Sequence, residues 1–137
     1  MREAYRDARY ALHSNGGYRG TPFFNTEPVE LSEASVVRGV TPYRILLRVA
    51  DGDGQLHVYV RGHRIEMRDF ACIHALVAAI NAGGPLAVAR LLDLLDPAWD
   101  RSIGQYFLLE LYKRRGIELV EQQNETATAY DGRKIFQ

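Results

Sequence analysis

The sequence predicts an α+β fold of winged-helix-like type, in which a three-stranded antiparallel meander is followed by three helices and preceded by an N-terminal arm. Two patterns predict it: short β-rich runs joined by turn residues between positions 43 and 68, and apolar residues at helical spacing between positions 70 and 115. A chain of 137 residues, 47% of them hydrophobic, suffices for one domain with a buried core. We expect residues 1–42 to form a helix and arm, 43–121 the winged-helix-like domain and 122–137 a tail.

The arm is expected to begin with a short amphipathic helix. In residues 2–12, charged side chains alternate with apolar ones at helical spacing, and the turn formers of "SNGGYRGTP" end the pattern. The stretch up to residue 42 has no sustained period, so we expect an extended segment over the core, with a short strand near Ser35–Val37. Phe23 and Phe24 are its expected anchors.

The meander is predicted from strands at 43–50, 55–60 and 64–68. The turns "DGDG" and "RGH" between them are too short for anything but antiparallel connections. Alternation in the third strand places Ile65 and Met67 toward the core. Its outward side chains are then Arg64, Glu66 and Arg68.

The first helix after the meander is predicted over 70–81, with Asp69 as its N-cap and "GG" as its end. Because it is apolar nearly all round, we expect it to be largely buried, with Cys72 as a small buried hydrophobic residue. A second helix is expected over 85–95, since Pro85 suits a first helical turn.

The third helix is predicted over 101–115, capped by Asp100 or Ser102, and a short strand over 117–121 follows it. Its core face is expected to consist of Ile103, Phe107, Leu108 and Leu111. A second line at helical spacing contains Gln105, Leu109 and Tyr112. Two interpretations of that second line stay open: it packs under the N-terminal arm, or it is an apolar groove for a peptide or another partner.

Charge and cysteine content limit the classes of function. Seventeen basic and seventeen acidic residues leave no net charge, whereas nucleic-acid-binding proteins usually carry a basic excess, so we do not expect a nucleic-acid partner. The basic run at 113–115 fits the C-terminus of a helix without any ligand. A single cysteine excludes an internal disulfide, and no apolar stretch is long enough for a signal peptide or membrane span, so we expect a cytoplasmic protein.

Catalytic chemistry is not expected. The four histidines show no spacing typical of an iron or zinc site, and no serine or cysteine stands in a nucleophile motif. We therefore predict a binding protein without a metal or another cofactor.

The order of elements from residue 43 to 121 resembles the PqqD-like recognition element of ribosomal peptide biosynthesis. The resemblance lies in the hairpin "YRILLRVADGDGQLHVYV", the strand "HRIEMRDF", the helical stretch "ACIHALVAAINAGGPLAVARLLDLL" and the ending "SIGQYFLLELYKRRGIELVE". The glycine between the helices and "LLELYKRRGIEL" also resemble the winged-helix tail of JmjC-type cupin oxygenases.

The first resemblance implies a non-catalytic adaptor that captures the leader of a precursor peptide and presents it to a separate modifying enzyme, possibly a metal-dependent one. The peptide is expected to add as a strand beside the third strand, next to the third helix. The residues implied are Arg64, Ile65, Glu66, Met67, Arg68, Gln105, Leu109 and Tyr112. The alternatives are a winged-helix nucleic-acid-binding regulator and an accessory or dimerisation domain of a cupin-type oxygenase.

Overall fold

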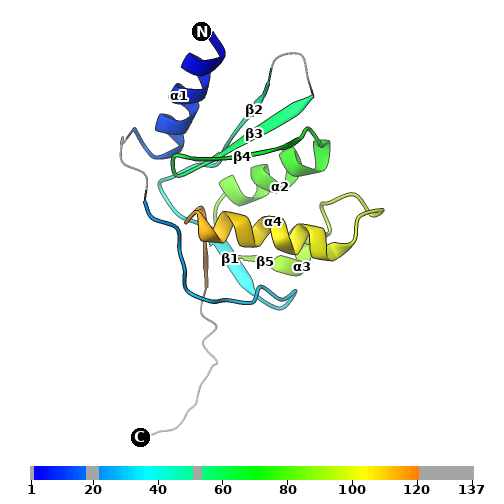
Figure 1. The fold of residues 1–137 in the computed structure, drawn as a ribbon. Helices are drawn as coiled ribbons and strands as arrows, with labels where there is room; N and C mark the ends of the chain where they lie inside the picture. Colours follow the sequence, from blue (N-terminus) through cyan, green and yellow to red (C-terminus); the bar gives the residue numbers. More distant parts are fainter. Residues whose placement is uncertain (1, 18–21, 51–53, 121–137) are drawn as a thin grey trace, which may run out of the picture.

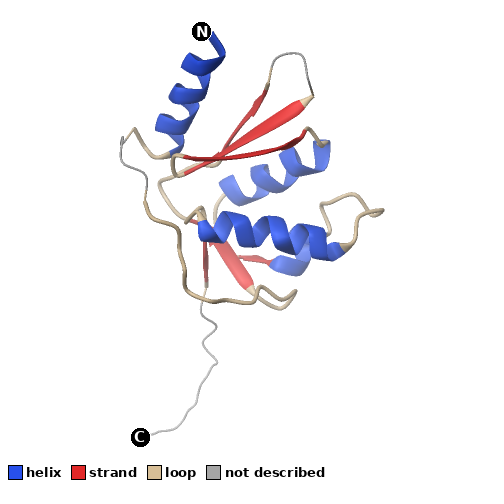
Figure 2. Ribbon diagram, in the orientation of Figure 1, coloured by secondary structure: helices blue, strands red, loops and turns tan. Residues whose placement is uncertain are grey.

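Four helices and six strands form an α+β fold in a computed structural model that describes residues 2–17, 22–50 and 54–120 (Figures 1 and 2). The helices are α1 (Arg2–Ser14), α2 (Ala71–Asn81), α3 (Val88–Leu92) and α4 (Arg101–Lys113). The strands are β1 (Val36–Gly39), β2 (Leu46–Val49), β3 (Gln55–Val60), β4 (His63–Arg68), β5 (Leu86–Ala87) and β6 (Ile117–Leu119). The predicted tail, residues 122–137, lies outside the described residues.

The predicted meander is confirmed as an antiparallel sheet of order β2-β3-β4. Arg61 and Gly62 form the two-residue turn between β3 and β4, both with positive φ (50° and 89°), as hairpin turns that match strand twist require. On the inner face, Leu56 lies opposite Met67 in the paired strands. The alternation therefore places the apolar side chains of β3 and β4 toward α2, as predicted.

A second antiparallel sheet, of order β5-β1-β6, was not predicted. The short strand expected near Ser35–Val37 is its centre: Val36 pairs with Ala87 of β5, and Arg38 pairs with Glu118 of β6. Sheet formation here joins three segments far apart in the sequence, which no local pattern reveals.

The prediction of one helix over 85–95 is wrong. Residues 86–87 are extended as β5 because they pair with β1, and the helix α3 begins only at Val88. Leu94 is 42% exposed. The buried residues of α3 are Val88, Leu91 and Leu92.

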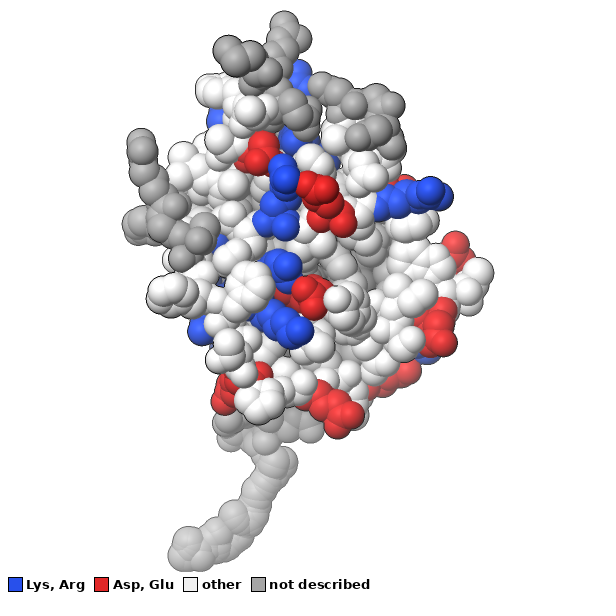
Figure 3. Space-filling model, viewed as in Figure 1, with Lys and Arg blue, Asp and Glu red and all other residues white. Residues whose placement is uncertain are grey.

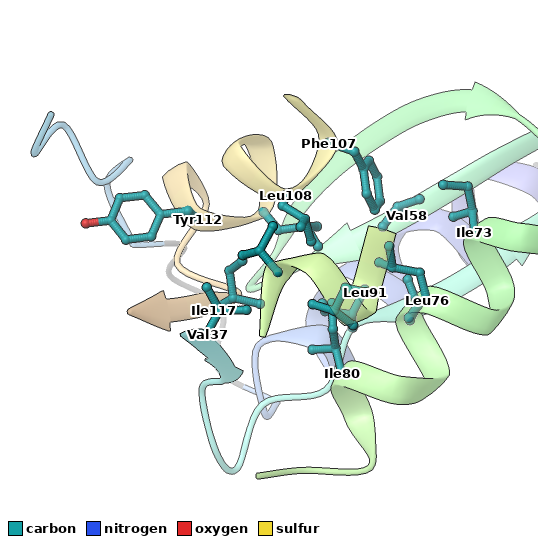
Figure 4. Close-up of a cluster of buried hydrophobic side chains, with 14 of the residues drawn as sticks. Val37, Val58, Ile73, Leu76, Ile80, Leu91, Phe107, Leu108, Tyr112 and Ile117 are labelled. Atoms are coloured by element: carbon teal, nitrogen blue, oxygen red, sulfur yellow. The ribbon is translucent and has the colours of Figure 1, made fainter. Parts of the chain in front are cut away.

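The core lies between the two sheets and is formed mainly by α2, α3 and α4 (Figures 1 and 4). Phe107 and Leu108 of α4 are buried as predicted, but Ile103 is 51% exposed, so its assignment to the core face is wrong. It lies in the first turn of α4, on a different side of the helix from its buried neighbour Gly104. Cys72 is only partly buried and packs against the core cluster.

The helix ends agree in part with the predictions. Gly83 and Gly84 both have positive φ after α2, and Asp100 caps α4 by accepting the N–H of Ser102 (2.9 Å). Asp69 does not cap α2, whose N-cap is Phe70 without a side-chain bond. The carboxylate of Asp69 instead accepts a hydrogen bond from Nε2 of His74 (2.7 Å).

The arm runs beside α4, but its expected anchors are wrong. Phe23 is 91% exposed and Phe24 is 44% exposed. Leu31 and Val37 are the residues of the arm that enter the core, at 6% and 0% exposure, and Val29 packs against the same cluster. The aromatic pair precedes Leu31 in the arm and lies near the C-terminal end of α4, outside the core cluster.

Candidate functional site

β4 is an edge strand, and its outward side meets no other strand among the described residues. Successive residues of an antiparallel strand alternate between bonding their neighbour and pointing N–H and C=O groups away from it. The N–H of Asp69 donates to the carbonyl of Gly54 (2.9 Å), which fixes the phase of this alternation. The backbone groups that point away from β3 are therefore those of Arg64, Glu66 and Arg68, and we call this row the β4 edge.

The side chains of β4 divide as the sequence predicted. Ile65 and Met67 are half-buried and pack against the core, while Arg64, Glu66 and Arg68 are exposed. A guanidinium nitrogen of Arg64 contacts the carboxylate of Glu66 at 2.5 Å. An added strand would thus meet apolar side chains on one face of β4 and charges of both signs on the other.

Aromatic contacts link both ends of β4 to α4. Beyond the end of β4, the ring of Phe70 meets that of Trp99, just before α4, with a centroid separation of 4.8 Å. At the start of β4, the ring of Phe24 contacts His63 (4.7 Å between centroids) and lies 4.9 Å from the guanidinium of Arg114. β4 and α4 therefore run in opposite directions, with residues that bridge them near both ends.

The side of α4 that faces β4 is not the one predicted. Arg114, Phe107 and Ile103 share a helix face, because they are separated by seven and four residues. Figure 4 shows Phe107 beside Val58 and Ile73, on the sheet side of α4. The exposed half of Ile103 therefore borders the β4 side of the helix.

The predicted second line of α4 is covered by the arm. Gln105 donates to the carbonyl of Leu31 (3.1 Å), and the hydroxyl of Tyr112 donates to Glu27 (3.3 Å). Tyr112 is 5% exposed, and Leu109 packs against the core cluster. Of the two interpretations of this line, the structure agrees with packing under the arm. The structure does not bring Gln105, Leu109 and Tyr112 together with the β4 edge.

The arm, in its described residues, contacts β4 at the start of the strand. Its hydrogen bond to β4, between Nε2 of His63 and the carbonyl of Pro22 (2.8 Å), and its ring contact through Phe24 both fall on the first residue of the strand. The arm then turns toward the end of α4, where the N–H of Asn25 donates to the carbonyl of Lys113 (2.6 Å). These contacts of the arm therefore lie at the start of β4 and at the C-terminal end of α4.

Comparison with known proteins identifies no family. No family model, no curated protein and no solved structure matches this chain.

A partly buried polar cluster on the other face of the sheet is not predicted by the sequence. It consists of Asp7, Arg48, His57, Tyr59 and Arg64, and we call it the Asp7 cluster. The strand residues alternate as on a solvent-facing surface, but α1 lies on this face (Figure 1), where Arg48, His57 and Tyr59 are buried while Arg64 stays partly exposed. The helical pattern of residues 2–12 predicts the helix that covers this face, but it does not predict where that helix docks.

Hydrogen bonds in the cluster converge on one oxygen of Asp7. Its Oδ1 accepts from the hydroxyl of Tyr59 (2.6 Å) and from Arg64 (2.7 Å), while Nη2 of Arg48 lies 3.9 Å away. Arg48 donates in turn to the Tyr59 hydroxyl (3.1 Å) and to Nδ1 of His57 (2.9 Å). These donors hold the carboxylate between three strands and α1.

The cluster shifts the ionisation of two of its members. Burial raises the pKa of Tyr59 to about 12, and the hydrogen bond to the carboxylate of Asp7 adds to this effect. Burial would also raise the pKa of Asp7, but the hydrogen bonds from Tyr59 and Arg64 outweigh it and lower that pKa. Tyr59 is therefore a hydrogen-bond donor at neutral pH and not a nucleophile.

The face of the molecule seen in Figure 3 offers little to a polyanion. Figure 3 shows acidic and basic side chains interspersed over the viewed face, without a large area of one sign. Within the described ranges, no three His, Cys, Asp or Glu side chains lie close enough to hold a metal ion, and no helix is long and apolar enough to cross a membrane.

Proposed function

We propose that this protein is a peptide-binding adaptor that takes up an extended peptide by strand addition at the β4 edge. The observation that carries the proposal is the row of outward backbone groups on Arg64, Glu66 and Arg68, because such a row is a template for another strand. The half-buried side chains of Ile65 and Met67 would supply apolar contacts on one face of the added strand. Ile103 would add apolar surface from α4.

The resemblance to recognition elements supports a narrower proposal. The peptide would be the leader of a ribosomally made precursor, and the adaptor would present it to a separate modifying enzyme in a hetero-complex. The order β2, β3, β4, α2, α3, α4 is compatible with the order that a winged-helix recognition element implies, although the two-residue strand β5 stands between α2 and α3. In this proposal the protein contributes binding and positioning, and the enzyme contributes the chemistry.

A selection from a random peptide display library tests the binding proposal. Peptides recovered on the wild-type protein should slow hydrogen exchange at the amides of Arg64, Glu66 and Arg68, since these N–H groups would become bonded. Protection confined to other elements would reject the β4 edge as the binding site.

Replacing Glu66 by proline should weaken peptide binding about fivefold, the equivalent of one hydrogen bond of about 1 kcal/mol. The N–H of Glu66 points away from β3, so its loss leaves the β3–β4 ladder intact. Titration calorimetry with a selected peptide measures the change. Glu66→Ala, which removes the side chain but keeps the N–H, is the matched control and should bind nearly as well as the wild type. Equal affinity of the folded proline variant would contradict strand addition here.

A further inference from the structure

The Asp7 cluster has the composition of a carboxylate-binding site on the sheet. The hydroxyl of Tyr59 and the guanidinium of Arg64 both donate to the same oxygen of Asp7, at 2.6 and 2.7 Å. The site walls are rigid, because Tyr59, Arg48 and His57 are 0%, 6% and 8% exposed. Every one of these donors comes from the sheet, whereas the carboxylate alone comes from α1.

Further attachments of α1 lie at and just beyond its C-terminal end. The N–H of Gly62 donates to Oγ of Ser14 (2.9 Å), and Arg61 donates to the side chain of Asn15 (3.2 Å). Further along, the ring of Tyr10 lies against that of Tyr59, with 5.4 Å between centroids. The described residues of α1 contribute nothing to the core cluster, so α1 is held on the sheet by polar and aromatic contacts, among which those of Asp7 lie at the middle of the helix.

The docking of α1 is largely polar. An open groove of about 310 Å³ runs beside α1 and is lined by Tyr5, Tyr10 and Leu46 of β2, among others. Burying an arginine and a histidine on a sheet face is costly, and apolar residues of similar size would often hold a helix at least as firmly. The docking of α1 therefore depends in part on the carboxylate of Asp7, which holds these donors.

Arg64 connects this site to the β4 edge. Its backbone N–H and C=O belong to the outward row, and its side chain holds Asp7. In an added strand, the residue paired with Arg64 would place its side chain on the same sheet face, with Cβ atoms about 5 Å apart. An Asp or Glu at that position can reach the guanidinium that holds Asp7.

We propose that Arg48, His57, Tyr59 and Arg64 form a carboxylate-binding site whose internal ligand is Asp7, and that an acidic side chain of the bound peptide takes the place of Asp7 and releases α1. The identity of the ligand as a peptide rests on the proposed function, whereas the carboxylate site itself does not. Peptide binding and undocking of α1 are then coupled through Arg64.

The site is tested with sodium formate on the full-length Asp7→Ala variant. This variant retains the core cluster, and formate is small enough to fill the place of the missing carboxylate. At ten times its Kd, formate should raise the Tm of Asp7→Ala by about 5 °C relative to sodium chloride of equal ionic strength. The wild type should respond much less, because Asp7 occupies the site. Glu33→Ala is the matched control, since it also removes an arginine-bound carboxylate but from an exposed pair with Arg101.

An equal response to formate in all three proteins would overturn the site.

The coupling is tested with peptides from the display selection, each compared as a Glu and a Gln version at its acidic position. The Glu version should bind at least fivefold more tightly and accelerate amide exchange in α1, and Arg64→Gln should abolish this preference. Selected peptides that protect β4 without an acidic preference would overturn the coupling alone. Failure to recover any β4-binding peptide would count against the proposed function, and the formate result would then decide the carboxylate site.

Discussion

Gly104 is a position at which one methyl group would disturb the packing of α4. A Cβ built there would overlap Cδ1 of Leu95 and Cδ2 of Leu92, both of which belong to the buried cluster. Glycine in a helix is usually a weakness, but here it permits α4 to lie directly on the segment that follows α3. The residue thus places the α4 face that borders β4.

Gly104→Ala should therefore destabilise the protein by up to about 2 kcal/mol, because an overpacking cost of about 1–3 kcal/mol outweighs a helix-propensity gain of about 1 kcal/mol. Urea unfolding monitored by circular dichroism measures the free energy of unfolding. Ser102→Ala, at an exposed position of the same helix, is the control and should be neutral or slightly stabilising. A Gly104→Ala variant more stable than the wild type would show that the two leucines rearrange freely.

At the scale of elements, α1 should undock in acid before the core unfolds. The pKa of Asp7 lies below its ordinary value of 3.8 because hydrogen bonds from Tyr59 and Arg64 favour the carboxylate, against the opposing effect of burial. A lowered pKa means that the docking contributed by Asp7 is fully present above pH 3.8 and is lost as the pH falls through the folded-state value.

Hydrogen exchange at the α1 amides, corrected for intrinsic rates and compared with α2, measures this loss. Protection of α1 in the wild type should fall below pH 3.8, while in Asp7→Asn it should be low and flat over the same range. The variant is needed because Glu33 and Glu110 also have lowered pKa values and contribute their own acid sensitivity. Identical pH profiles for the two proteins would show that Asp7 does not hold α1.

The elements that could be predicted are those whose signals are local. β3, α2 and α4 have a clear period and nearby turn residues, and the outward charges of β4 follow from alternation alone. The second sheet could not be predicted, because β5 has two residues and its partner β1 is separated from it by the whole meander. Likewise, Tyr59 has the position of a solvent-facing residue in β3 until α1 is placed over it. The part of the predicted site on β4 has exposed side chains at Arg64, Glu66 and Arg68. The part on α4 is covered by the arm, and the sequence does not show the path of the arm.

At the scale of the whole molecule, the arm is part of the fold and not an appendage to it. β1 provides the central strand of the second sheet, and its Val37 is completely buried. Leu31 enters the core from the same segment. α1 is different, since its attachments to the sheet are polar and aromatic and lie outside the core cluster.

The two N-terminal parts should therefore respond differently to truncation. A fragment beginning at Pro22, without α1, should unfold cooperatively in urea, because both sheets and the core cluster are retained. A fragment beginning at Tyr43 should not fold, because β5 and β6 would lose their common partner and the core would lose Val37 and Leu31. Removal of each of those buried aliphatic side chains costs about 2–4 kcal/mol, which approaches the total stability of a domain of this size. Amide proton dispersion and the urea transition measure folding of both fragments. A folded fragment from Tyr43 would mean that the meander and the three helices hold together without the second sheet, and the shorter unit would then be the one that binds the peptide.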